Sequence, residues 1–196
     1  MSDALNEFLE ELASESEDVL FLLKEATESI NYYRRLLERF ELDALTGLPS
    51  SNKFRDLMDD IENRAKTIGI IFFDVNDLKM YNDTKGHNAG DALIQKAAES
   101  FMSFTSPTVQ TYRIGGDEFA TVMINCKEDD IEKVMIKWRE ELAKLNTLDD
   151  GITCSVSAGY AFGDIGFSHS EVLQLADDRM YENKKEIKAA KGQVPR

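Results

Sequence analysis

Hydrophobic residues in the first 43 positions recur with the seven-residue period that is typical of a coiled coil. No glycine or proline interrupts this segment. The two series of seam positions are Leu9, Ser16, Leu23, Ile30 and Leu37, and Leu5, Leu12, Val19, Ala26, Tyr33 and Phe40. We therefore expect residues 1–43 to form a helix that pairs with a second copy of the chain, giving a homodimer.

An alternative interpretation of this segment is a helix, or two helices that break near Ser14 to Ser16, packed on its own domain. Leu20, Phe21 and Leu22 favour it, because they add apolar surface outside the two series. The dimer-forming helix accounts for more of the pattern. Neither interpretation places catalytic residues here.

Beyond this segment the pattern alternates between helical and strand periods. Helices are expected over 51–66, 91–104, 129–145 and 170–188, and strands over 68–75, 109–114, 119–124 and 152–161. Between 76 and 91 we expect one helical turn and then a loop at 86–90. The order predicts an α+β domain over residues 44–190, with helices packed on one sheet, and a disordered tail over 191–196.

The charge balance narrows the possible partners. The chain has 37 acidic and 23 basic residues and a net charge of −14, which disfavours nucleic acid and anionic membranes. A nucleotide remains compatible, because a metal ion can lie between acidic protein and phosphate. No run reaches the roughly 18 apolar residues of a membrane span, so we expect a cytoplasmic chain without a membrane segment. Cys126 and Cys154 are too few for a disulfide framework or a zinc site.

The turn between the two central strands holds the clearest candidate chemistry. Gly115 and Gly116 suit a tight reversal, because glycine adopts positive φ angles without steric cost. Asp117 and Glu118 follow directly and place two carboxylates beside bare backbone. This arrangement suits a divalent cation and the phosphates that it carries, although taken alone the pattern is most often only a turn.

Polar residues after the first strand add further candidates. Asp74 lies at the end of a buried strand, where a carboxylate is costly without a partner, so it is a candidate ligand; a helix N-cap is equally compatible. Lys79 suits a phosphate, and Asn82 and Asp91 suit the edge of a purine. The last helix ends with lysines that serve either the helix dipole or a phosphate.

Assembled in order, these motifs make residues 43–188 resemble the GGDEF family, the diguanylate cyclases. Their order and spacing are far more specific than any one of them. The motifs are Asp43 to Pro49, Asp74 with Leu78-Lys79, Asn82-Asp83, Gly86-His87, Gly90-Asp91, Gly115 to Phe119, Ser155 to Gly159, and Ala176-Asp177 with Met180-Tyr181 and Lys184.

The resemblance implies a palm-like nucleotide-cyclase fold, with a central, mainly antiparallel sheet flanked by helices. It implies that each of two facing subunits binds one GTP, and that the pair forms cyclic di-GMP and releases two pyrophosphates. Asp74, Asp117 and the Val75 carbonyl would bind two Mg²⁺ or Mn²⁺ ions. Glu118 would act at the metal or as a proton acceptor, and the sequence does not choose between these roles.

The resemblance also assigns the contacts to the nucleotide. Asn82 and Asp91 would bind guanine, and Asp91 favours GTP over ATP because a carboxylate accepts from the guanine N1–H and amino group. The implied phosphate-binding residues are Gly115, Gly116, Lys79, Lys184 and Lys188.

Several positions depart from the family pattern. Ser50-Ser51-Asn52 replaces Asn-Arg-Arg, which affects no catalytic residue, and Asn76 replaces an aspartate outside the principal metal ligands. Ile187-Lys188 replaces Gly-Arg, so we expect weaker nucleotide binding. Ser106 and Val109 occupy the positions of the Arg-x-x-Asp product-inhibition site, so we expect no inhibition through that route.

Two classes of function follow. The first is an active cyclase, favoured by the intact turn and by Asp74. The second is a catalytically silent GTP-binding domain that acts as a regulatory interaction module; such domains usually lose one of these features. A promiscuous cyclase that makes mixed purine dinucleotides is a narrower alternative, and Asp91 argues against it.

Overall fold

The computed structural model describes residues 16, 18–33 and 41–192. The chain divides into two compact units, Met1–Glu41 and Leu42–Arg196. No helix among the described residues combines the length and the apolar composition needed to cross a membrane.

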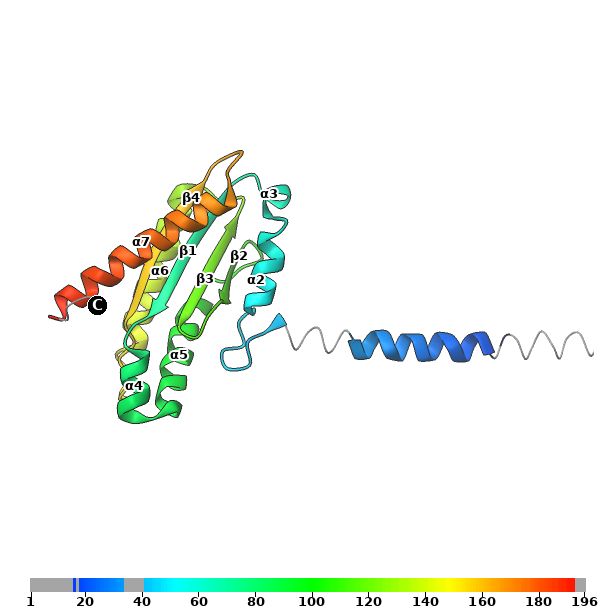
Figure 1. Cartoon of the computed structure of the whole chain (residues 1–196), viewed down its shortest axis with the longest axis horizontal. Coiled ribbons are helices and arrows are strands. Elements are labelled where there is room, and N and C mark those ends of the chain that lie inside the picture. The colour runs from blue at the N-terminus through cyan, green and yellow to red at the C-terminus, as the bar shows by residue number, and fades with distance from the viewer. Residues whose placement is uncertain (1–15, 17, 34–40, 193–196) are drawn as a thin grey trace, which may run out of the picture. The chain divides into compact units, whose positions relative to one another are not determined.

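Residues 18–33 of the first unit form a helix (Figure 1). Its large apolar side chains are exposed. Seam positions and their neighbours are alike in this respect, with 56–69% of the surface exposed at Val19, Leu20, Phe21, Leu22, Leu23, Ile30 and Tyr33. The seam positions Leu5, Leu9, Leu12, Leu37 and Phe40 lie outside the described residues. The predicted helix is therefore found over 18–33, and its pairing stays a prediction.

Four antiparallel strands form the centre of the second unit, in the spatial order β2-β3-β1-β4. The strands are β1 Ile68–Val75, β2 Val109–Arg113, β3 Glu118–Ile124 and β4 Val156–Gly163. β1 is buried along its length except at Phe72, because it lies between β3 and β4 and carries branched and aromatic residues. The register places Asp74 opposite Glu118 on one side and Ser157 on the other.

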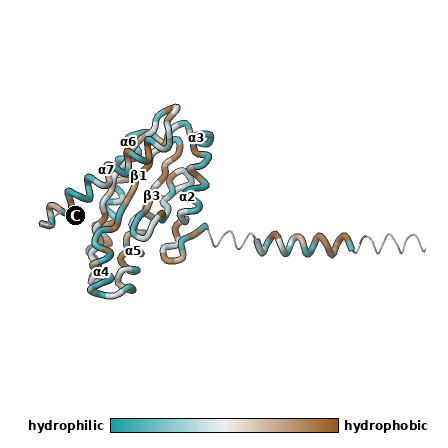
Figure 2. Tube along the Cα trace, in the orientation of Figure 1, coloured by the Kyte–Doolittle hydropathy of each residue, from teal (hydrophilic) through white to brown (hydrophobic). Residues whose placement is uncertain are grey.

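Helices cover both faces of the sheet (Figure 1). The helices are α2 Ser51–Met58, α3 Ile61–Arg64, α4 Leu78–Lys85, α5 His87–Met102, α6 Glu128–Leu145 and α7 His169–Ala190. α5 and α6 pack on one face around Phe73, Phe101 and Trp138. α2, α3 and α7 pack on the other around Ile61 and Ile70. Figure 2 shows the resulting contrast between the hydrophobic strands and the more polar α4 and α7.

The predicted mixed fold, one antiparallel sheet flanked by helices, is confirmed, but several boundaries differ. The helix expected over 51–66 is two helices, α2 and α3, because the chain turns at Asp59 and Asp60. The single helical turn expected after 76 is the eight-residue α4. The loop expected at 86–90 is the first turn of α5, since only Gly86 takes a positive φ, at 86°.

The last strand also begins later than expected, at Val156 instead of residue 152. Residues 152–154 bond to side chains and not to a neighbouring strand, whereas the Ser155 carbonyl accepts from the Asn76 amide at 2.8 Å. Asn146 bonds both the amide and the carbonyl of Cys154, at 2.8 Å each, and the Tyr81 hydroxyl bonds Thr153. These contacts satisfy the backbone groups that a strand would have paired.

Gly159 lies where β4 and α7 make their closest contact. A Cβ atom there would lie 2.5 Å from the Ala176 carbonyl oxygen and would overlap the Met180 backbone nitrogen. We expect Gly159→Ala to destabilise the fold by about 3 kcal/mol, because backbone atoms cannot rotate away. Denaturant unfolding measures this. Gly116→Ala is the matched control, since its Cβ would meet no atom within 4 Å. Equal stability of the two variants would contradict this packing.

Candidate active site

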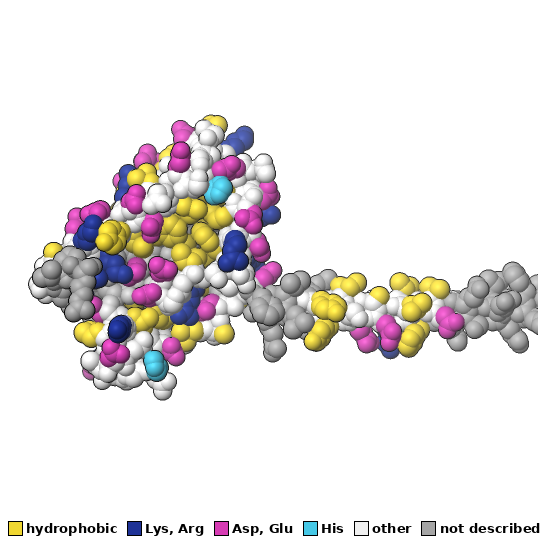
Figure 3. All heavy atoms as spheres, viewed as in Figure 1, with side chains coloured by type: hydrophobic (Ala, Val, Ile, Leu, Met, Phe, Trp, Pro, Cys, Tyr) yellow, Lys and Arg dark blue, Asp and Glu magenta, His cyan; other side chains and the backbone are white. Residues whose placement is uncertain are grey.

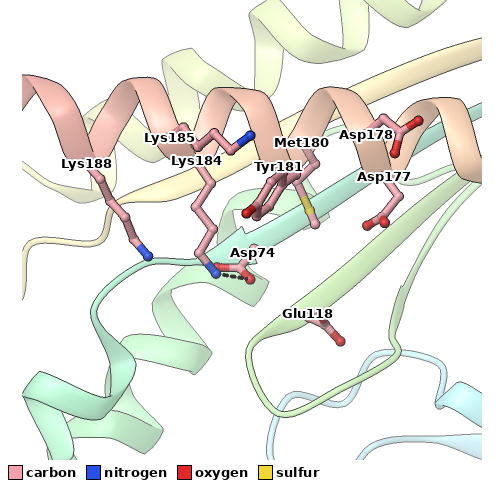
Figure 4. Close-up of a pocket in the computed structure, with 9 residues that line it drawn as sticks. All are labelled: Asp74, Glu118, Asp177, Asp178, Met180, Tyr181, Lys184, Lys185 and Lys188. Carbon is pink, nitrogen blue, oxygen red and sulfur yellow. Dashed lines mark hydrogen bonds and ion pairs between the residues drawn. The ribbon is translucent and has the colours of Figure 1, made fainter. Parts of the chain in front are cut away.

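A cavity of about 370 Å³ lies between the ends of β1 and β3 and the overlying α7 (Figure 4). Its lining residues are Asp74, Glu118, Asp177, Asp178, Met180, Tyr181, Lys184, Lys185 and Lys188. Carboxylates from two strands thus meet lysines from one helix. Lys184 and Lys188 reach from α7 toward the end of β1.

Asp74 is buried, and its two oxygens differ in their partners. Oδ2 accepts a hydrogen bond from Lys184 Nζ at 2.6 Å, whereas Oδ1 is buried without a hydrogen-bond partner. Burial raises the pKa of Asp74, and the charge of Asp117 adds to the rise, while Lys184 and Lys188 oppose it. A buried carboxylate oxygen without a partner is costly, and a bound cation would satisfy it.

The turn that carries Asp117 is held from two sides. The Val75 amide donates to the Asp117 carbonyl at 2.8 Å, and Arg113 Nη2 donates to the Gly116 carbonyl at 2.7 Å. Val75 directly follows Asp74. The backbone therefore fixes the two predicted metal-binding aspartates relative to one another.

The chain reverses at the two glycines, between the antiparallel strands β2 and β3, as predicted. Neither Gly115 nor Gly116 takes a positive φ, so the expected reason for glycine at these positions is wrong. A Cβ atom at Gly115 would lie 2.5 Å from Glu118 Oε2, so this glycine makes room for the glutamate. Gly116 has no atom within 4 Å of such a Cβ, which leaves its backbone open to a ligand.

Glu118 lies in a strongly negative environment. Desolvation raises its pKa, and the charges of Asp117, Asp74 and Asp177 raise it further, while Lys184 opposes them. Its ionised form is therefore unfavourable without a cation nearby.

The candidate guanine-binding residues lie on α4 and α5. A Cβ atom at Gly90 would overlap the Asn82 side-chain oxygen, so this glycine lets the two helices approach. Asp91 follows it directly and is exposed. Asn82 and Asp91 do not line the cavity beneath α7, and neither does Lys79, which is exposed on α4. The structure thus separates the candidate base contacts from the carboxylates.

Asn76, which replaces a family aspartate, serves the fold. Its side chain is buried, donates to Ser155 Oγ at 3.2 Å and accepts from Ser157 Oγ at 3.0 Å. These bonds attach the end of β1 to the start of β4. They direct Asn76 away from a ligand role.

The residues present fit a metal ion that arrives with a nucleotide. Among the described residues, no group of three or more His, Cys, Asp or Glu side chains is arranged to hold a metal alone. Magnesium in nucleotide sites typically takes one or two carboxylates and completes its shell with water and phosphates. Asp74, Asp117 and the Val75 carbonyl match that pattern, and the unpartnered Asp74 Oδ1 is a free ligand atom.

Several residues that build the site were not predicted to do so. Asp177 and Tyr181 line the cavity together with Lys184 and Lys188. All four share one face of α7, with spacings of four, three and four residues, and this periodicity was available in the sequence. Arg113 was missed as well, because its partners are distant in sequence.

An apolar groove of about 390 Å³ adjoins the cavity. Its hydrophobic lining residues are Phe72, Phe73, Ile114, Leu173 and Met180, and it shares Met180, Glu118 and Asp177 with the cavity. Figure 3 shows hydrophobic surface at the centre of this face, bordered by charged side chains.

Comparison with known proteins identifies the architecture. Residues 40–190 match the family model described as diguanylate cyclase, GGDEF domain. The chain belongs to the GGDEF family. The resemblance seen in its motifs is thereby confirmed.

Curated relatives of this GGDEF protein carry two kinds of name. Diguanylate cyclase DgcN of Escherichia coli is 31% identical over 148 residues, which span 72% of this chain and 36% of DgcN. Cyclic di-GMP phosphodiesterase PdeR of the same organism is 28% identical over 174 residues, which span 84% of this chain and 26% of PdeR. The match thus spans only a minor part of each relative.

Solved GGDEF structures share the fold. The GGDEF domain of DgcB from Caulobacter crescentus, in complex with c-di-GMP, has a TM-score of 0.67 at 28% identity, over 74% of this chain and 91% of that one. A DgcB structure that includes a coiled coil has a TM-score of 0.71 at 26% identity, over 84% of this chain and 93% of that one.

The charge at Glu118 gives a test of the site's electrostatics. In chelator at pH 7.5, we expect Glu118→Gln to raise the Tm by roughly 1–3 °C, because it removes repulsion among carboxylates. Because the Glu118 pKa is raised in the folded state, its ionised carboxylate destabilises the wild-type fold in full at any pH above that raised pKa. The Tm gain of Glu118→Gln therefore shrinks as the pH falls through the raised pKa toward the ordinary glutamate pKa.

Thermal unfolding measures this gain. Glu132→Gln on α6 is the control, because Glu132 is exposed and lies outside the cavity, and we expect no change in its Tm. A Glu118→Gln protein that melts at or below the wild-type temperature would contradict the electrostatic account.

Proposed function

We propose that this chain is a metal-dependent diguanylate cyclase that condenses two GTP molecules into cyclic di-GMP and two pyrophosphates. The observation that carries the proposal is the meeting of Asp74 with the Gly115–Glu118 turn. An unpartnered carboxylate oxygen lies there beside an open glycine backbone. Such a place suits a cation and a triphosphate together.

The reaction forms two phosphodiester bonds. The 3′-oxygen of each GTP attacks the α-phosphorus of the other, the bond from that phosphorus to the β-phosphate bridging oxygen breaks, and pyrophosphate leaves. Asp74, Asp117 and the Val75 carbonyl would hold two Mg²⁺ or Mn²⁺ ions, which would neutralise charge on the triphosphate and lower the pKa of the attacking hydroxyl.

The protein's own side chains bind and orient the nucleotide. Lys184 donates a hydrogen bond to Asp74 and lines the cavity, so when a nucleotide binds its ammonium group can leave the Asp74 carboxylate and bond a phosphate oxygen. Lys188 adds a second positive charge from the same helix face. Glu118, with its raised pKa, is suited to accept the proton of the attacking hydroxyl. Asn82 and Asp91 bind guanine.

One subunit supplies half of this reaction, so two must face each other. We propose that the N-terminal helix brings them together as a homodimer. Its apolar side chains are exposed over residues 18–33, and burial of such side chains favours helix pairing. The coiled coil in the DgcB structure supports this arrangement by analogy.

A catalytically silent GTP-binding module is the second candidate. It is favoured by relatives such as PdeR, whose name is that of a phosphodiesterase. Such a module would bind GTP through the same contacts, and its pairing with a facing subunit would serve regulation and not catalysis. Product formation separates the two candidates.

The test is to incubate the purified chain with GTP and Mg²⁺ and to identify products by chromatography and mass spectrometry. We expect cyclic di-GMP from the wild type, and a rate lowered at least about a thousandfold in Asp117→Ala, because the substitution removes a metal ligand. ATP should give no cyclic product, because adenine lacks the N1–H and the 2-amino group from which the Asp91 carboxylate would accept hydrogen bonds. If dimers with bound GTP form no product, the silent module is correct.

A further inference from the structure

Arg113 connects two parts of the domain that are far apart in sequence. Its Nη1 donates to Asp43 Oδ1 at 2.9 Å, and its Nη2 donates to the Gly116 carbonyl at 2.7 Å. The side chain is 15% exposed, and its Nε is buried without a partner. Because the guanidinium is planar and rigid, a displacement at one nitrogen moves the other.

Asp43 is the fixed point at the other end of this link. Its Oδ1 also accepts from the Thr46 amide at 2.9 Å and from the Thr46 hydroxyl at 2.7 Å. Burial raises the pKa of Asp43, but the hydrogen bonds from Thr46 and Arg113 outweigh it and hold the pKa below its usual value. The carboxylate therefore stays charged toward Arg113 at neutral pH.

The same segment is also bonded through the backbone. The Asp43 amide donates to the Leu48 carbonyl at 2.8 Å, and the Arg113 amide donates to the Pro49 carbonyl at 2.9 Å. Asp43 lies two residues after the end of the first compact unit, Met1–Glu41. The link therefore begins at the junction between the N-terminal segment and the catalytic domain.

At its other end the link acts on the residue before Asp117. Glycines restrain a backbone less than other residues do, so the Gly115-Gly116 peptide needs outside contacts to hold one conformation. Arg113 holds the Gly116 carbonyl, and the Val75 amide holds the next carbonyl along. Loss of the Arg113 bond frees the Gly116 carbonyl, although the Val75 amide still holds the Asp117 carbonyl and the Ile114 and Gly115 amides still donate to the Glu118 carbonyl.

We propose that Arg113 is a positioning residue that orients the Asp117 turn for a divalent cation, with Asp43 setting the position of Arg113. The junction at Asp43 thereby tunes the metal affinity of the site. This inference rests on the proposed function, because it assumes that Asp117 is a metal ligand.

The test measures Mn²⁺ affinity of the full chain by the electron paramagnetic resonance signal of free Mn²⁺. A GTP analogue with a methylene α–β bridge is present, so that no turnover occurs. We expect Arg113→Lys and Asp43→Asn each to weaken Mn²⁺ binding by about 10-fold or more, the range for groups that orient metal ligands. The double variant should bind Mn²⁺ as tightly as whichever single variant binds it less tightly, because both substitutions break the same link.

Steady-state kinetics add a second readout. In Arg113→Lys the KM for Mg²⁺ should rise, while kcat recovers at saturating Mg²⁺. A purely structural defect would lower kcat by reducing the folded fraction and leave that KM unchanged. Thr46→Val, which removes one of the donors to Asp43, is a milder variant and tests the same link if Arg113→Lys does not fold.

The matched control is the exposed ion pair of Arg64 and Asp60, with a distance of 3.0 Å. Arg64→Lys and Asp60→Asn should leave Mn²⁺ affinity unchanged. If folded Arg113→Lys, Asp43→Asn and Thr46→Val all bind Mn²⁺ with wild-type affinity, this inference is wrong and the proposed function still stands. Absence of Mn²⁺ binding by the wild type would overturn the proposed function together with it.

Discussion

The antiparallel pairing of β1 with β3 is the constraint on which the site depends. It sets Asp74 opposite Glu118 and bonds Val75 to Asp117, so that three carboxylates gather at one end of a buried sheet. Their mutual repulsion and desolvation are relieved only in part by Lys184 and Lys188. Because the apolar strands fix the register, the carboxylates cannot separate, and the site favours added positive charge.

This arrangement explains the role of α7. The helix packs on β4 at Gly159, where backbone approaches backbone, and so brings its lysines over the end of β1. One face of α7 thereby supplies cations next to carboxylates from the strands. The groove beside it is apolar, whereas the cavity is charged, so the two surfaces suit different contacts.

Strong local patterns were predictable from the sequence. β1 was expected over 68–75 and runs from Ile68 to Val75, because a run of branched and aromatic residues specifies a buried strand. The carboxylates and lysines of the site were selected for their motifs, and the structure places Asp74, Glu118, Lys184 and Lys188 around one cavity.

Features set by tertiary contact were not predictable. Gly90 suggested a loop, yet it lies inside α5. The position requires glycine because the Asn82 side chain occupies the space where a Cβ atom would lie. Arg113 lies 70 residues from Asp43, and no local pattern links them. The Gly115-Gly116 pair suggested a turn with positive φ angles, whereas its small size serves Glu118 and an open backbone.

The central claim is that two facing subunits each supply half of the reaction. Wild-type and Asp117→Ala chains can be co-refolded in known proportions at constant total protein, with albumin replacing the variant as the dilution control. The rate of cyclic di-GMP formation should fall with the square of the wild-type fraction, to about one quarter of the full rate at equal proportions. A rate that falls in simple proportion to the wild-type fraction would contradict the account, because each subunit would then complete the reaction alone.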